Sequence, residues 1–374
     1  MTRNIGILLS FISQLLFFSC TSSKIQSPQK EEIRLLFAGD IMAHTEITER
    51  DFSDAFTDIE SLVKNADLAF ANFESPVDDS RNQSSYPTFS CHSDFVQKAM
   101  DSGFNVFSLA NNHTNDFHRE GILATKFFFD SKVSAGIFSA GIKENEKDGI
   151  EFKMIEKNGF TVLFASVTEV LNFKTCTQMF DYVPPDEKGR QEFIKTISRK
   201  RRENPSALMI LSFHTSEEEY VSSIAEKSKK FYYSIIDAGI DILWINHPHV
   251  PKEWNVITSG NSGNDKCIFY SVGNTISAQR RKPDFRRPDK NMENTGDSFL
   301  FLVDLKKDAD GIRIQNLEPV IITTFINEQN NFVIKRLDDS FIENLKAQGN
   351  DRWASYLSGR KKIMEAVKGK STWQ

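Results

Sequence analysis

The 374-residue chain carries 46 lysines and arginines against 51 aspartates and glutamates. This near balance excludes an overall basic field of the kind that binds nucleic acid, and the net charge of -5 favours a well-solvated surface. The length fits one large α/β unit or two average domains, and either would bury a sizeable core.

The N-terminus predicts export. Arg3 precedes the apolar run IGILLSFISQLLFFS, which ends at Cys20 and is followed by polar residues. A membrane-spanning helix needs about 20 apolar residues, so this shorter run after a charged residue is typical of a secretory signal. The ending FFSC resembles a bacterial lipobox and predicts a signal peptide over residues 1–20, lipid on Cys20 and a polar linker over residues 21–32. An ordinary cleaved signal and an uncleaved anchor are the alternatives.

Every one of these alternatives exports the remainder of the chain. We expect it to be lipid-anchored to the cell membrane or the outer membrane, facing the periplasm or the cell surface. Cys91, Cys176 and Cys267 would then lie in a compartment that permits disulfides. Three is an odd number and their spacing matches no zinc motif, so the pairing stays open.

Short apolar runs alternate with longer amphipathic segments from residue 33 onward, which is the pattern of an α/β fold. Helical periodicity marks residues 93–103, 121–132 and 220–239, the last with Gly239 as a C-cap. Buried strands are expected at IRLLFA (33–38), DLAFA (67–71), NVFSLA (105–110), TVLFASV (161–167), ALMILSF (207–213), DILWI (241–245) and CIFYSV (267–272).

The sequence changes character at residue 298. Residues 298–325 predict two antiparallel strands around a DG turn, and the last 45 residues or so are mostly helical and polar in pattern. We interpret both as parts of one fold, with a main domain over residues 33–325 and a C-terminal extension over residues 326–374.

Polar side chains follow six strands at the point where each strand ends. They are Asp40; Asn72 and Glu74; Asn111, Asn112, His113 and Asp116; His214; His247 and His249; and Asn274. In open α/β sheets, ligands bind outside the carboxyl ends of the strands. Each group alone has an ordinary explanation as a turn, a helix cap or a hydrogen-bonded loop residue. Three histidine positions and two carboxylates at successive strand ends together predict a single site.

Imidazole, carboxylate and amide oxygen without thiolate suit Zn, Mn, Fe or Ni. Two such metals about 3.5 to 4 Å apart are the usual apparatus for hydrolysing phosphate esters. His113, flanked by Asn112 and Asp116, is the candidate general acid. His247 and His249 are alternate residues that both turn toward the same cluster, and Pro248 stiffens the loop between them. A hydrogen-bonded loop pair is the alternative.

Six motifs in chain order are similar to those of the CapA family of capsule or poly-gamma-glutamate synthesis proteins. They are AGDIM, ANFESPV, SLANNHTND, LSFH with Glu218 four residues on, INHPHV and YSVGNTI. The resemblance covers roughly residues 33 to 325. It implies a calcineurin-like metallophosphatase fold, a four-layer α/β/β/α sandwich, here with a C-terminal β/helical extension.

This resemblance also implies two divalent metal ions, Mn, Fe or Zn, and a phosphoester or an anionic envelope polymer as substrate. Other capsule-synthesis proteins become expected partners, and nucleic acid does not. It implies that Asp40 and His249 hold one metal, that Asn112, His214 and His247 hold the other, and that Glu74 bridges them. The expected substrate or supporting groups are Asn72, Asn111, Asp116, Glu218, Asn274, Arg280 and Arg281.

The chain departs from the family pattern at three places. Ile245 and Asn246 replace Gly-His of the usual Gly-His-His-Pro-His, Thr215 and Ser216 replace Trp-Gly after the strand-end histidine, and Thr275 replaces a common Phe. The H-x-H pair is intact, so metal-dependent hydrolysis is the first hypothesis. A non-catalytic accessory protein that binds polymer is the second, and a structural lipoprotein with a vestigial site is the third.

A basic loop follows Asn274. Residues 278–290, AQRRKPDFRRPDK, hold six lysines and arginines. A solvated, salt-bridged loop is the ordinary interpretation. The functional alternative is a basic rim that attracts an anionic polymer or phosphate, with Arg280, Arg281, Arg286 and Arg287 as its members.

Overall fold

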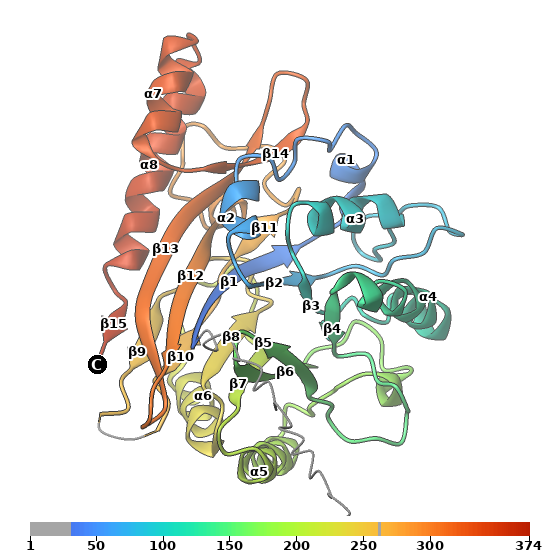
Figure 1. Ribbon diagram of the computed structural model, residues 1–374. Helices are drawn as coiled ribbons and strands as arrows, with labels where there is room; N and C mark the ends of the chain where they lie inside the picture. The colour runs from blue at the N-terminus through green and yellow to red at the C-terminus, as the bar shows by residue number, and fades with distance from the viewer. Residues whose placement is uncertain (1–30, 261–262) are drawn as a thin grey trace, which may run out of the picture.

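Two stacked β-sheets with helices on their outer faces make up the computed structural model, which describes residues 31–260 and 263–374 (Figure 1). The expected signal peptide and Cys20 lie outside the described residues. Among the helices of the described residues, none is long and apolar enough to cross a membrane.

The first sheet has the strand order β14-β13-β12-β1-β2-β3-β4, and β11 pairs with the end of β1. Strands β1 to β4 run parallel, whereas β12 to β14 are antiparallel additions beside β1. Its strands are β1 (Glu32–Ile41), β2 (Leu68–Phe73), β3 (Val106–Ser108), β4 (Phe138–Ala140), β11 (Asn274–Ile276), β12 (Asp297–Lys307), β13 (Ile312–Ile326) and β14 (Phe332–Arg336).

The second sheet has the order β15-β9-β10-β8-β7-β6-β5. Strands β6, β7, β8 and β10 form a parallel centre, and β5 and β9 pair antiparallel to it. Its strands are β5 (Lys153–Lys157), β6 (Phe160–Thr168), β7 (Leu208–His214), β8 (Ile242–Asn246), β9 (Trp254–Ile257), β10 (Lys266–Phe269) and β15 (Thr372–Trp373).

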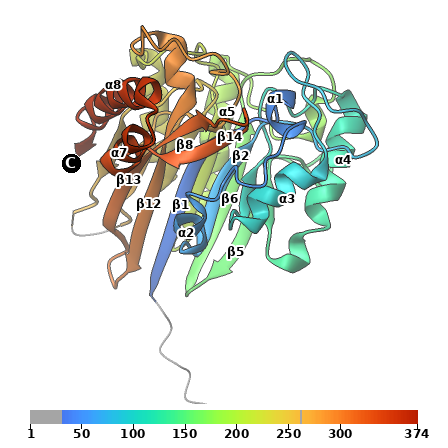
Figure 2. The same cartoon turned by 90° about the horizontal axis from the view of Figure 1, so that it is seen from above.

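Helices cover both outer faces, as Figure 2 shows from above. The first sheet carries α1 (Thr45–Thr48), α2 (Glu60–Lys64), α3 (Ser93–Asp101) and α4 (His118–Asp130); the second carries α5 (Glu187–Glu203) and α6 (Glu226–Ala238). The remaining helices are α7 (Asp339–Ala347), α8 (Asp351–Lys368) and the 3-10 turns η1 (Val133–Ala135), η2 (Thr177–Met179) and η3 (Asn291–Gly296). The predicted four-layer α/β/β/α class is confirmed by this arrangement.

The core between the sheets follows from the alternation of side chains along buried strands. On β1, Leu35 and Phe37 face the second sheet, whereas Leu36 faces the helices, because successive side chains point to opposite sides. The ring of Phe37 stacks on Phe70 at 4.7 Å between centroids and lies 5.9 Å from Trp244 of β8. Aromatic packing close to the strand ends therefore holds the two sheets against each other.

The C-terminal extension shares this core. Residues of α7 and α8 belong to the same hydrophobic cluster as Phe37, and Trp353 of α8 packs on Phe325 of β13 at 4.7 Å. The expected antiparallel pair around the DG turn is confirmed as β12 and β13, and the last residues are mostly helical, as expected. Cys91, Cys176 and Cys267 are all free thiols.

One predicted helix begins later than expected. The segment over residues 220–239 is helical only from Glu226, although Gly239 ends it with φ of 129°, as predicted. Tyr220 has φ of 64°, and its backbone N–H donates to the carbonyl of Pro248 at 2.9 Å. The first six residues of the predicted helix are therefore a loop that contacts the segment holding the histidine pair.

Replacing Phe37 with alanine should lower the free energy of unfolding by about 3–5 kcal/mol, because it removes a buried ring from the contact between the sheets. Urea denaturation of the full-length protein measures this change. Phe127→Ala is the matched control, since that side chain is 78% exposed and its loss should change the free energy by less than about 0.5 kcal/mol. Equal effects of the two substitutions would contradict the packing described above.

Candidate metal centre

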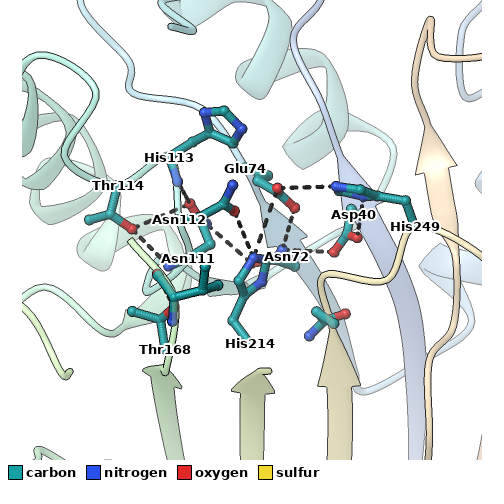
Figure 3. Close-up of polar contacts among 12 residues, drawn as sticks. Asp40, Asn72, Glu74, Asn111, Asn112, His113, Thr114, Thr168, His214 and His249 are labelled. Carbon is teal, nitrogen blue, oxygen red and sulfur yellow. Dashed lines mark hydrogen bonds and ion pairs between the residues drawn. The ribbon is translucent and has the colours of Figure 1, made fainter. Parts of the chain in front are cut away.

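The carboxyl ends of strands from both sheets meet at one edge of the sandwich. Asp40 of β1 is level with Asn72 of β2 and with Asn274 of β11. In the second sheet, His214 of β7 is level with Asn246 of β8. The two sheets thus bring their polar strand ends into one cluster, which Figure 3 shows in close-up.

Two carboxylates form the floor of this cluster. The amide nitrogen of Asn72 donates to Asp40 Oδ1 at 2.7 Å and to Glu74 Oε2 at 3.2 Å (Figure 3). Both carboxylates are buried, and Glu74 Oε1 has no hydrogen-bond partner among the described residues. That oxygen lies 3.6 Å from His249 Nε2 and 3.9 Å from His214 Nε2.

Three buried histidines face these carboxylates. His249 Nδ1 lies 3.0 Å from Asp40 Oδ2 and 2.9 Å from Asn274 Oδ1, and His214 Nε2 lies 2.8 Å from Asn112 Oδ1. The His247 ring centre is 4.9 Å from that of His214 and 5.9 Å from that of His249. Asp40, Glu74, Asn112, His214, His247 and His249 are thus brought together.

The histidine pair is held in a rarely populated backbone conformation. His247 has φ of 98° and His249 has φ of 57°, a region that favours glycine. Such strain persists where the surrounding structure imposes it, and it is concentrated at functional sites. The turn at Pro248 aims both rings at the carboxylates.

The burial of these groups sets their protonation. Burial, and then the neighbouring Asp40 carboxylate, raise the pKa of Glu74 well above its usual range. Burial, and then neighbouring imidazoles, lower the pKa of His214 and His247 well below 6.5. Burial opposes protonation of His249 as well, but Glu74 and Asp40 raise its pKa to about 9. At neutral pH, His214 and His247 therefore keep ring lone pairs for a cation.

A divalent cation fits this set of donors. Ligand atoms of Glu74, His247 and His249 lie within 4.8 Å of one another, and so do those of Asp40, Glu74 and His214. Besides Glu74 Oε1, the Nδ1 atoms of His214 and His247 are buried without a hydrogen-bond partner among the described residues. Buried polar atoms left without a partner are costly, and a metal beside Glu74 Oε1 would satisfy that oxygen.

Glu74 belongs to both groups, as a bridging ligand does. His249 also contacts Asp40 at 3.0 Å and His214 contacts Asn112 at 2.8 Å, so the division of ligands that the family resemblance implies stays a prediction.

His113 stands beside the cluster with a carboxylate behind it. Its Nδ1 lies 2.6 Å from Asp116 Oδ2, which also accepts the backbone N–H of Phe89 at 2.6 Å. The amide nitrogen of Asn172 lies 3.0 Å from the same ring atom. These contacts occupy Nδ1 and leave Nε2 as the ring nitrogen able to exchange a proton with a ligand.

The other predicted site residues have different surroundings. Asn111 shapes the turn, since its side chain donates to the carbonyl of Phe73 at 2.9 Å and accepts the backbone N–H of His113 at 3.2 Å. Glu218 is exposed and makes no hydrogen bond or ion pair with any described residue. Arg281 is exposed and lies 3.3 Å from Glu46.

The interpretation of Arg280 as part of a basic rim is wrong, because its side chain is buried. Its guanidinium lies 2.8 Å from the Asp297 carboxylate and also donates to the backbone carbonyls of Glu293, Gly296 and Thr324. Arg286 and Arg287 are exposed. Of the four arginines of the predicted basic rim, only Arg281, Arg286 and Arg287 are therefore exposed.

Two further residues at the site were missed. His44 Nδ1 accepts the backbone N–H of Ala278 at 3.3 Å, and its ring packs edge-on against Phe89, which packs in the same way against His113. Its position four residues after Asp40 was the only signal. Asn172 donates to Asp116 Oδ1 at 3.1 Å from the loop after β6, and no motif marked it.

The fold and the site define a protein with a four-layer α/β/β/α sandwich and a buried histidine–carboxylate cluster at its strand ends. Residues 34–279 match the family model described as "Bacterial capsule synthesis protein PGA_cap", and the chain belongs to this family. The resemblance derived from the six motifs is confirmed.

Two curated relatives are similar to most of the chain. "Capsule biosynthesis protein CapA" of Bacillus anthracis is 26% identical over 299 residues, which cover 75% of this chain and 69% of the relative. "PGA biosynthesis protein CapA" of Bacillus subtilis is 25% identical over 324 residues, which cover 83% of this chain and 78% of the relative.

Two solved structures also match. The calcineurin-like phosphoesterase YfkN from Bacillus subtilis has a TM-score of 0.39 and 12% identity, covering 88% of this chain and 99% of that chain. GAP50, the anchor in the inner membrane complex of Plasmodium, has a TM-score of 0.40 and 11% identity, covering 82% of this chain and 89% of that chain.

Replacing Glu74 with glutamine should abolish stabilisation by metal. In the wild type, Mn²⁺ at about 100 times its dissociation constant should add about 2.7 kcal/mol to the free energy of unfolding. Glu74→Gln should lose this gain and, without metal, be at least as stable as the wild type, because a buried carboxylate beside Asp40 is removed. Thermal melts with and without Mn²⁺ measure both effects.

Glu218→Gln is the matched control, since the Glu218 carboxylate lies outside the cluster, and it should keep the full gain from metal. Retention of that gain in Glu74→Gln would contradict a bridging carboxylate.

Proposed function

We propose that this protein is an exported, lipid-anchored hydrolase that depends on two divalent metal ions, Mn, Fe or Zn. Its substrate would be a phosphoester or a related bond in an anionic envelope polymer, and its role would lie in capsule or poly-gamma-glutamate synthesis. The two CapA relatives, whose names state capsule and PGA biosynthesis, support the role. The cluster supports the chemistry.

One observation carries the catalytic part of the proposal. Glu74, buried between His214 and His249, presents an oxygen with no hydrogen-bond partner among the described residues to two overlapping sets of metal-type ligands. A metal pair bound there would polarise a phosphoryl oxygen and make a nearby water acidic. Asp40, Glu74 and the three buried histidines would hold it.

Residues around the cluster would donate the proton to the leaving group, orient a ligand and attract the substrate. His113 would donate a proton from Nε2 to the leaving oxygen, while Asp116 holds Nδ1 and stabilises the protonated ring. Asn112 would orient His214 through its 2.8 Å contact and complete the ligand set. Arg281, an exposed residue seven positions after Asn274, would attract an anionic substrate by its charge.

The expected lipid on Cys20 would hold this site near a membrane. Only twelve residues separate Cys20 from residue 33, where the main domain is expected to begin. An extended chain spans at most about 3.3–3.6 Å per residue, so the domain would work within about 45 Å of the bilayer surface. Anchoring would keep it beside a polymer assembled at the membrane.

Binding of polymer without turnover is a second candidate function. Asn246, which replaces a family histidine, donates its amide to Ser212 at 3.1 Å, and Thr215 bonds the hydroxyl of Tyr232 at 2.8 Å. Asn246 and Thr215, which differ from the family pattern, thus both contact protein groups behind the cluster. They favour a changed substrate preference or the loss of catalysis.

Turnover distinguishes the two functions. His113→Ala should lower metal-dependent hydrolysis of an alkyl phosphodiester by about 10²–10⁴-fold, because the alkoxide leaving group needs a proton. The loss should be much smaller for bis-p-nitrophenyl phosphate, since nitrophenolate leaves without protonation. Steady-state rates of the full-length protein with Mn²⁺ measure both.

His118→Ala is the matched control, because that exposed ring contacts Thr175 rather than Asp116. An equal loss on the two substrates would contradict a proton-donating His113. A wild type that binds metal and hydrolyses neither substrate would favour the binding function.

Lipid attachment is tested on the full-length protein in a bacterial host. Metabolic labelling with radioactive palmitate should mark the wild type and leave Cys20→Ser unlabelled, because the lipobox cysteine is the acceptor. Cys176→Ser, which removes a thiol that is partly exposed in the folded domain, should stay labelled. Equal labelling of wild type and Cys20→Ser would contradict the anchor.

A further inference from the structure

Asn274 connects the candidate metal centre to a part of the chain outside the family match. Its Oδ1 lies 2.9 Å from His249 Nδ1, and its amide nitrogen donates to the carbonyl of Thr295 at 2.8 Å. Residues from 280 onward lie beyond the matched residues 34–279. The Asn274 amide nitrogen also donates to Ser277 Oγ at 3.0 Å and to Gln279 Oε1 at 2.8 Å. Thr295 is therefore the one of these three partners that links Asn274, and through it His249, to the segment beyond residue 279.

A buried ion triad holds that segment. Asp297, two residues after Thr295, accepts Arg280 Nη1 at 2.8 Å on one carboxylate oxygen and Arg360 Nε at 2.6 Å on the other. All three side chains are buried. Burial opposes ionisation of Asp297, but the two guanidinium groups lower its pKa below the usual value. Each oxygen of the Asp297 carboxylate is bonded by a different guanidinium, so the two arginines together fix its position and orientation.

Arg360 reaches the segment at more than one point. From α8 it also donates Nη2 to Asn294 Oδ1 at 2.7 Å and Nη1 to the carbonyl of Pro288 at 2.5 Å. The neighbouring turn of the helix adds Tyr356, whose hydroxyl bonds the Glu293 carboxylate. One face of α8 therefore fixes the segment over residues 288–297 along its length.

The segment is also built to accept these arginines closely. A Cβ on Gly296 would lie 1.9 Å from Arg280 Nε, so only glycine fits between Thr295 and Asp297. Arg280 Nη2 donates to the Gly296 carbonyl at 3.1 Å. The Thr295 carbonyl that accepts the Asn274 amide is thus held from both sides by contacts of neighbouring residues with the buried side chains of Arg280 and Arg360.

From these contacts we infer that Arg360 of α8 is a positioning residue for the candidate metal centre. It acts through Asp297, Thr295 and Asn274 on His249. This inference rests on the proposed function where metal binding is concerned, and it assigns the C-terminal extension a part in building the site. Arg360 touches neither metal nor substrate.

The test compares Arg360→Met and Lys362→Met in the full-length protein. Lys362 lies on the same helix, is exposed and makes no ion pair with a described residue, so it is the matched control. Mn²⁺ affinity is measured by calorimetry, and hydrogen–deuterium exchange of the metal-free protein is followed over residues 270–279 and 208–214. Circular dichroism reports whether each variant is folded.

Arg360→Met should weaken Mn²⁺ binding about tenfold, the lower end of what outer-shell substitutions cost in metal affinity. Exchange should quicken over residues 270–279 and stay unchanged over residues 208–214 of β7, whereas Lys362→Met should match the wild type. Arg360→Lys keeps the charge but loses contacts, so it should show a smaller effect in the same direction. If Arg360→Met fails to fold, Arg360→Lys alone tests whether Arg360 positions Asn274.

Wild-type affinity and wild-type exchange in folded Arg360→Met, or in Arg360→Lys where Arg360→Met is unfolded, would overturn the inference. A wild type that binds no Mn²⁺ would instead refute the proposed function, and the exchange data from the metal-free protein would still decide whether Arg360 positions Asn274.

Discussion

The buried Glu74 carboxylate is the constraint around which the site is organised. It shares the Asn72 amide with Asp40, lies within 4 Å of ring nitrogens of His214 and His249, and keeps one oxygen without a hydrogen-bond partner among the described residues. Two adjacent buried carboxylates are costly without positive charge to balance them. The surrounding imidazoles, with positive φ at His247 and His249, are arranged as ligands for that charge.

The fold supplies this arrangement only when both sheets are packed. Asp40 and Glu74 come from the first sheet, and His214 and His247 follow strands of the second. The aromatic core around Phe37, Phe70 and Trp244 sets the distance between the sheets directly below. The C-terminal helices complete this core and hold the segment behind Asn274. Stability and site geometry therefore depend on the same packing.

The sequence predicted the parts of the site that depend on strand ends. Asp40, Glu74, His214, His247 and His249 each follow an apolar run, and the carboxyl ends of parallel strands meet at one edge. Seven predicted strands and the four layers are present for the same reason. The backbone conformation of the histidine pair was not predictable, because positive φ at a histidine has no sequence signal.

Two sequence predictions were wrong at places where contacts with residues far away in the sequence determine the structure. Arg280 sits in a basic loop and was expected at the surface, but Asp297 and the carbonyls around it draw the guanidinium inside. The loop before Glu226 follows a helical pattern, yet the contact of Tyr220 with Pro248 overrides that local preference. In both cases tertiary contacts outweigh the local pattern.

In the function proposed above, Glu74 belongs to the ligands of two metal ions. The most direct measurement is an anomalous difference map, recorded at the manganese edge from crystals grown with Mn²⁺. We expect two peaks about 3.5 to 4 Å apart, both within bonding distance of the Glu74 carboxylate and each next to at least one of His214, His247 and His249. No peak in this cluster, with all five ligands ordered as described, would contradict this role of Glu74.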